Sequence, residues 1–141
     1  MSELTEPLTR EHEIILRHLT RLERALWDHT DESMRAELNA LRGVLVPHRR
    51  KEEEVLFREL TLSLPVQCLL DEHEEEERLI GTLRSALDSG DRDTVVRSGQ
   101  SLLDHLRNHI WKEDHILYPM AEQSIEGEAR NRVLAGFRQE G

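Results

Sequence analysis

The sequence has few of the residues that build disulfides, loops and membrane spans. Among 141 residues there are one cysteine, four prolines and seven glycines, and aromatic residues make up only 4%. A single cysteine, Cys68, cannot form an internal disulfide, which favours a reducing compartment. No stretch approaches the ~20 apolar residues that a transmembrane helix needs, and the first residues lack the apolar core of a signal peptide. We therefore expect a cytoplasmic protein that does not bind membranes.

Charged residues are abundant, and most of them are acidic. There are 29 acidic and 19 basic side chains, which gives a net charge of −10. Such a surface repels nucleic acid and anionic membranes, so we expect neither as a partner. The many Leu and Glu residues are typical of amphipathic helices rather than a sheet. We expect one domain over residues 1–141, with a core at 5–122 and a C-terminal extension at 123–141.

Apolar residues recur at alternating intervals of three and four, which indicates helices that pack in a bundle. The expected helices span residues 5–28, 32–60, 63–88 and 92–118, with a short fifth helix at 129–137. Thr5 is expected to cap the first helix. Pro47 should bend or loosen the second just before His48, and the fourth should end near Pro119. Short connections between long helices predict an all-α, up-down-up-down antiparallel four-helix bundle.

The two halves of the chain align without a gap at an offset of 61 positions. Each half keeps one His followed later by His-x-x-x-Glu, and the residues are His12, His48, Glu52, His73, His109 and Glu113. All six fall on the apolar seams, where ionisable groups are unfavourable unless they are paired or ligated. The rise of a helix places the four histidines in one layer, roughly 25–30 Å from the turns near residues 30 and 90. The two glutamates follow one turn further on.

Four imidazoles and two carboxylates form a donor set that suits iron, manganese or zinc. Structural zinc usually takes four ligands, often with thiolate, so six donors fit two metal ions better. Each ion would have two histidines, and both glutamates would bridge. A bridging oxo or hydroxo group would bring each ion to five ligands, and at this point iron, manganese and zinc all stay open. A coincidence of surface His and Glu is the alternative, against which the repeat and the common depth argue.

Three further residues lie near this layer. Glu76 falls on the seam and Glu77 lies one turn after His73, so either could ligate or hydrogen-bond a ligand, or simply face solvent. His105 precedes His109 by one turn and could support it or add a ligand.

Two other side chains have an ordinary and a chemical interpretation. Tyr118 is expected to be a packing wedge at the end of the bundle rather than a redox residue. Cys68 is expected to be a small buried residue rather than a redox thiol.

Four segments resemble the hemerythrin-like (HHE cation-binding) domain family: EHE at His12, HRRKEEEVLF from His48, DEHEE at His73 and HIWKEDHILYP from His109. The resemblance covers roughly residues 8 to 120. It implies a non-haem di-iron centre in a four-helix bundle, with roles in oxygen binding, peroxide or nitric-oxide handling, or iron sensing. On this resemblance we expect two iron ions with a bridging oxo or hydroxo group, and favour manganese or zinc less.

This chain departs from the oxygen-carrying hemerythrins at two ligand positions. Those proteins have His-x-x-x-His on the third helix, where this chain has Glu77, and His-x-x-x-x-Asp on the fourth, where it has Glu113. A carboxylate-richer site stabilises oxidised metals. Redox turnover with peroxide, sensing or storage is therefore favoured over reversible oxygen carriage.

Three functions follow as hypotheses. The first is a di-iron protein that acts on a small oxidant, namely oxygen, peroxide or nitric oxide. The second is an iron- or oxygen-sensing or metal-storage module without catalysis, and the third is a metal-free helical interaction domain. The sequence leaves open whether the protein is an enzyme and what its oligomeric state is.

Overall fold

The computed structural model describes residues 4–60 and 64–140, and every regular element in these ranges is helical, which confirms the all-α class. The elements are α1 (Glu6–Trp27), α2 (Asp31–Lys51), η1 (Glu52–Leu56), η2 (Phe57–Glu59), α3 (Leu64–Ser89), α4 (Arg92–Lys112), η3 (Glu113–Leu117), α5 (Tyr118–Ser124) and α6 (Gly127–Glu140). Here η1 and η3 are π-helical turns and η2 is a short 3₁₀ turn.

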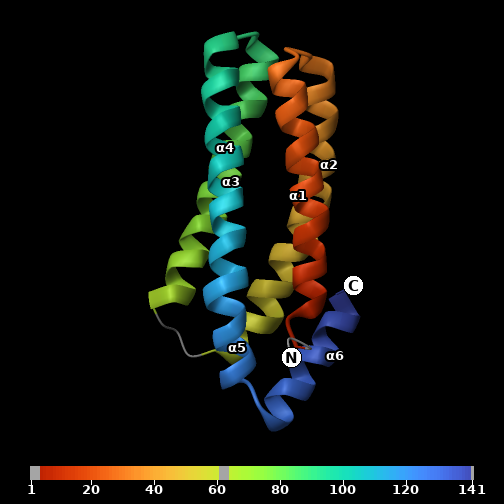
Figure 1. Cartoon of the computed structure of the whole chain (residues 1–141), viewed down its shortest axis with the longest axis vertical. Helices are drawn as coiled ribbons and strands as arrows, with labels where there is room; N and C mark the ends of the chain where they lie inside the picture. Colours follow the sequence, from red (N-terminus) through yellow and green to blue (C-terminus); the bar gives the residue numbers. More distant parts are fainter. Residues whose placement is uncertain (1–3, 61–63, 141) are drawn as a thin grey trace.

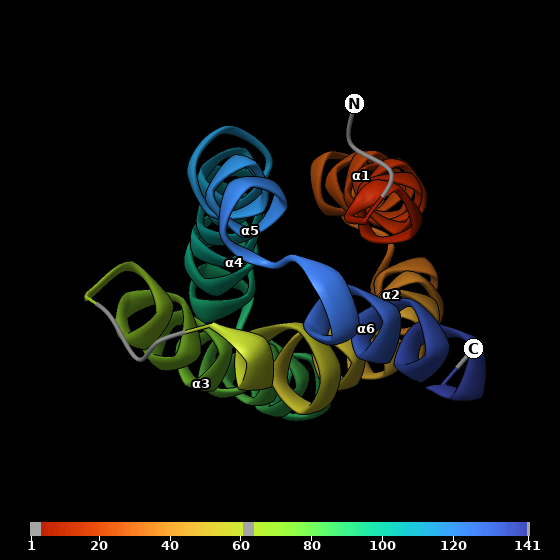
Figure 2. The same ribbon diagram turned by 90° about the horizontal axis from the view of Figure 1, so that it is seen from below.

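Four long helices lie side by side along the long axis of the molecule, and the chain reverses direction at each connection between them (Figure 1). Contacts are densest between α1 and α2 and between α3 and α4, so each half of the repeat forms a helical hairpin. Seen from below, α6 lies across the end of the bundle at which α1 begins (Figure 2). The expected fifth helix is thus present, and Val133 and Phe137 bury its apolar face.

The apolar core has two separate clusters. One includes Ile15, Leu45, Leu79 and Leu106, and the other includes Leu8, Leu56, Leu69 and Leu117. Along each long helix a buried histidine lies near the change from one cluster to the other, and the second cluster is reached in η1 after α2 and in η3 after α4. The layer between the clusters is therefore polar, although apolar residues close it off on both sides.

The start of α1 differs from the expectation. Thr5 occupies the N-cap of α1, but its side chain makes no capping hydrogen bond. Instead the backbone N–H groups of Leu4 and Thr5 donate to Glu122 Oε1, at 2.8 and 3.2 Å, so a distant carboxylate satisfies this end. Ser63, expected to open the third helix, lies outside the described residues.

The chain does not loosen at the turn just before His48, where Pro47 was expected to bend or loosen it, and its helical structure does not end at Pro119. Pro47 lies within α2, which stays α-helical to Lys51, and the loosened turn begins only at Glu52. Pro119 does not end the last helix, which continues as α5 to Ser124. The π-turn finishes at Leu117 and Pro119 then lies in the first turn of a new α-helix, where its missing N–H is tolerated. No helix in the described ranges has the length and apolar character needed to cross a bilayer.

Candidate metal centre

The structure brings together all six side chains on which the sequence hypothesis depends. They come from α1, α2, η1, α3, α4 and η3, and each is at most 3% exposed: His12, His48, Glu52, His73, His109 and Glu113. Both glutamates are the first residues of π-turns, and each turn closes by a hydrogen bond from the N–H five residues later to the glutamate carbonyl. π-turns widen a helix locally and are frequent at functional sites. The repeat thus places two widened turns at the same layer.

The donor atoms form two overlapping groups of four. The first group is His12, His48, Glu52 and Glu113, and the second is Glu52, His73, His109 and Glu113; within each, the atoms lie within 4.8 Å of one another. His12 Nε2 lies 2.9 Å from Glu113 Oε1, and His73 Nε2 lies 3.1 Å from Glu52 Oε1. Both glutamates belong to both groups. This is the arrangement that two bridging carboxylates require.

The spacing of these atoms fits metal coordination. Atoms bound at about 2.1 Å from one ion lie roughly 3.0–3.4 Å from their neighbours in the shell. The His109 Nε2 to Glu113 Oε2 distance is 3.2 Å, and the His48 Nε2 to Glu52 Oε2 distance is 3.6 Å. Within the described residues, several inward-facing atoms of the cluster lack a hydrogen-bond partner, including His48 Nε2, His73 Nε2 and Glu52 Oε1. Buried atoms of this kind are unfavourable unless something binds them.

Comparison with known families gives an independent result. The family model for the hemerythrin HHE cation binding domain matches residues 3–121 of the chain. The chain belongs to the hemerythrin HHE cation-binding family. No curated protein and no solved structure matched it. Membership supports cation binding by the domain, while the ligand role of each of the six residues stays a prediction.

Around the hemerythrin-family cluster lies a second layer of carboxylates that sequence reasoning missed. Each histidine places its outer nitrogen, Nδ1, against one of them; the pairs are His12–Asp114 (2.7 Å), His48–Glu11 (2.8 Å), His73–Glu53 (2.6 Å) and His109–Glu72 (2.9 Å). A carboxylate on Nδ1 fixes the ring so that Nε2 presents its lone pair to a metal. The signal was present in the repeat, because Glu11 and Glu72, and Glu53 and Asp114, are also 61 positions apart.

Two lysines extend this layer in the same symmetric way. Lys51 donates to Glu11 Oε2, and Lys112 donates to Glu72 Oε2 at 2.6 Å. The hydrogen bond with His109 and the one from Lys112 outweigh the effect of burial and lower the pKa of Glu72 to about 2, so Glu72 is ionised at neutral pH.

The two sides of the cluster differ at Tyr118. Its hydroxyl donates to Glu52 Oε2 at 2.6 Å and lies 3.2 Å from His12 Nε2, whereas the equivalent residue, Phe57, only stacks on His73. Tyr118 was expected only to pack at the end of the bundle, but it also donates a hydrogen bond to a residue of the cluster. The residue is fully buried and touches the cluster.

The two sides also differ at Glu76, which stands where the first half has Ile15. Glu76 is 1% exposed, its Oε2 lies 3.6 Å from His109 Nε2, and that oxygen has no hydrogen-bond partner among the described residues. Glu77 instead faces outward and pairs with Arg42 and Arg49. Of the two open candidates, Glu76 is the one that reaches the cluster.

His105 and Cys68 lie outside the cluster. His105 Nε2 lies 3.1 Å from the carbonyl oxygen of Glu72 and 3.9 Å from Glu76 Oε2, so it flanks the cluster. Cys68, expected to be buried, is exposed, and its thiol donates to Glu72 Oε2 at 3.4 Å. The seam of α3 runs through Leu69 and His73, which turns position 68 outward.

The electrostatics of the cluster favour bound cations. Burial lowers the pKa of His73, but the carboxylates of Glu52 and Glu53, which lie against its two ring nitrogens, outweigh burial and raise the pKa to about 9. For His109, burial likewise opposes the charge of Glu113, and the pKa rises to about 11. Burial raises the pKa of Glu113, yet the neighbouring histidines hold it well below its ordinary value. In the metal-free protein His73 and His109 therefore carry protons that metal ions would replace.

Proposed function

We propose that this chain is an up-down-up-down four-helix bundle that binds two iron ions and uses them to react with a small oxidant. The observation that carries the proposal is the pair of four-donor groups that share Glu52 and Glu113. His12 and His48 would hold one ion, and His73 and His109 the other. A bound iron pair supplies redox electrons and coordination positions for oxygen, peroxide or nitric oxide.

The protein's own residues would prepare this site in three ways. The carboxylates on Nδ1 orient the imidazoles before the metal arrives, which limits the reorganisation that binding requires. The apolar clusters on both sides limit access of solvent, and the cavity lined by the six residues measures about 10 Å³, which is roughly the room for one water molecule. The hydroxyl of Tyr118 donates a hydrogen bond to Glu52. Its proton therefore lies beside the space between the two donor groups and could be delivered there.

The donor set favours turnover over reversible carriage of oxygen. Two shared glutamates and a buried Glu76 place three carboxylates within or beside the cluster, and such oxygen donors stabilise oxidised metals. Peroxide is therefore the oxidant that we favour. The alternative is a sensing or storage role without catalysis, which the sharing of glutamates between the two hairpins supports, because metal loading would then tie the hairpins together.

Metal analysis tests the proposal directly. Protein expressed with added iron should contain close to two irons per chain and absorb in the near ultraviolet. His48→Leu and His109→Leu should lower the metal content and the melting temperature of the loaded protein, whereas His115→Leu, an exposed control on η3, should change neither. If the chain held no iron, or the two variants were more stable than wild type, the site would be a metal-free core.

The amount of peroxide that the iron-loaded protein consumes then distinguishes a catalytic role from a sensing or storage role. An iron protein that turns over peroxide should consume many equivalents per chain, with the near-ultraviolet band returning after each addition. A sensor or storage module should consume about one equivalent per iron pair and stop. The second outcome would leave the metal site in place and exclude the catalytic role.

A further inference from the structure

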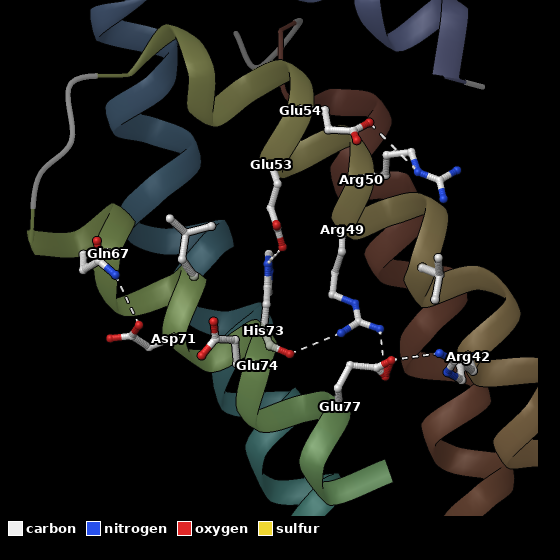
Figure 3. A pocket seen from close by; sticks show the side chains of 12 residues that line it. Arg42, Arg49, Arg50, Glu53, Glu54, Gln67, Asp71, His73, Glu74 and Glu77 are labelled. Carbon is white, nitrogen blue, oxygen red and sulfur yellow. Dashed lines mark hydrogen bonds and ion pairs between the residues drawn. The ribbon is translucent and has the colours of Figure 1, made fainter. Parts of the chain in front are cut away.

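A groove of about 740 Å³ runs along the outside of the bundle between α2 and α3 (Figure 3). Its lining includes Arg42, Arg49 and Glu53 from the α2 side and His73 and Glu77 from α3. Glu53 lies in the groove with its carboxylate against His73 Nδ1, so the groove reaches the outer edge of a predicted metal ligand.

Two side chains, Arg49 and His73, line both this groove and the small enclosed cavity of the metal centre. They are therefore the wall between solvent and the cluster. The Arg49 side chain crosses from α2 to α3, where Nη1 donates to the carbonyl oxygen of His73 at 3.2 Å and Nη2 lies 3.4 Å from Glu77 Oε2. The residue is 8% exposed and closes the groove floor beside the imidazole.

The repeat shows that a charged wall is not required at this position. The residue 61 positions after Arg49 is Ile110, which is 5% exposed and lines the same cavity from α4. An isoleucine cannot leave its place without exposing apolar surface. An arginine has a long flexible stem and a head that water solvates, so it can turn outward into the groove.

The contacts of Arg49 suit a side chain that moves. Glu77 also pairs with Arg42, through its other carboxylate oxygen at 3.0 Å, and so keeps a cationic partner when Arg49 leaves. The His73 carbonyl lies within α3 and retains its helix environment. When this wall opens, Glu77 therefore keeps Arg42 as its partner, and the buried Glu76 keeps His109 beside it.

We propose that the α2–α3 groove is the route by which the oxidant reaches the metal centre, and that Arg49 is its gate. The inference rests on the proposed function. The ligand it fits is small and hydrogen-bonding, such as hydrogen peroxide or a small anion, because the guanidinium offers N–H donors at the point of passage. A large anion is disfavoured, because the five carboxylates of the groove outnumber its three arginines, Arg42, Arg49 and Arg50.

A gate changes rates without changing affinity, and this property gives the test. Azide is added to iron-loaded protein, and its association and dissociation rates are followed by stopped-flow absorbance. Arg49→Lys keeps the charge but loses the fork that spans His73 and Glu77, so both rates should rise severalfold with Kd unchanged. Arg49→Ile copies the opposite wall and should slow both rates by a similar factor. Arg42→Lys, on the rim, should behave as wild type.

Each other outcome has a distinct meaning. Unchanged rates in both Arg49 variants, with two irons still bound, would overturn the gate and leave the proposed function standing. The same would follow if Ile110→Val accelerated azide as much as Arg49→Lys, because the route would then lie on the opposite wall. A wild-type chain without iron would overturn the metal centre itself, and the gate with it.

Discussion

At the scale of single residues, the carboxylates behind the imidazoles distinguish this centre from a chance group of histidines. Any buried histidine can find one partner, but here four rings each have a carboxylate on Nδ1 and an Nε2 that faces the cluster. Such partners fix both the tautomer and the direction of a ligand. Their loss should weaken metal binding even though they do not touch the metal.

Glu72→Gln should therefore lower metal affinity by roughly 10- to 100-fold, because His109 loses the anion that orients it and raises its basicity. Competition with a chelator of known affinity measures the change. Glu74→Gln is the matched control, since Glu74 lies two residues further on and is exposed. Equal affinities for the two variants would show that the outer carboxylates have no part in the site.

At the scale of elements, the π-turn η1 joins the metal centre to the C-terminal helix. Glu52 begins the turn, and Val55 within it packs against α6 at Gly136. A Cβ built at Gly136 would lie 2.7 Å from Val55 Cγ1, which is closer than van der Waals contact allows. Only glycine lets α6 approach the turn so closely.

Gly136→Ala should lower the free energy of unfolding by about 1–3 kcal/mol, because the added methyl group must displace Val55 or the helix. Gly81→Ala is the control, since a Cβ there meets nothing within 4 Å. That change should raise stability by roughly 0.5–1 kcal/mol through helix propensity. Urea unfolding of the two variants gives both values, and a Gly136→Ala protein as stable as wild type would argue against close docking of α6.

At the scale of the whole molecule, two hairpins are joined by a polar layer. Contacts within each hairpin are denser than those between hairpins, and the polar layer interrupts the apolar core. Glu52 belongs to the first hairpin and Glu113 to the second, yet each is a member of both donor groups. Bound metal would therefore cross-link the hairpins and stabilise the folded state.

Removal of the metal should lower the melting temperature. A ligand present at 1,000 times its dissociation constant stabilises the folded state by about 4 kcal/mol, and a buried metal pair should contribute at least this much. Calorimetry with and without a chelator measures the difference. The double variant Glu52→Gln/Glu113→Gln should show no difference in melting temperature on adding the chelator. A wild-type melting temperature that does not change with the chelator would contradict the cross-link.

The sequence alone determined the helices, the repeat and the layer of the six polar residues. Helix period and rise are nearly constant, so residues such as His12 and His48 could be assigned to a face and a depth by counting. The burial of all six agrees with that count. The repeat also contains the outer carboxylates. The helical period does not show, however, which neighbouring helix Glu11 or Glu53 contacts.

Only the tertiary structure decided the features that depend on the rotation and spacing of neighbouring helices. The π-turns at Glu52 and Glu113 add a residue to a turn, which a period of three and four cannot reveal. The choice of Glu76 over Glu77, and the position of Arg49 between groove and cluster, depend on side-chain reach across an interface. The spacing of residues along one helix fixes the face on which each residue lies. A contact between two helices also depends on the position of the partner helix, which the sequence does not give.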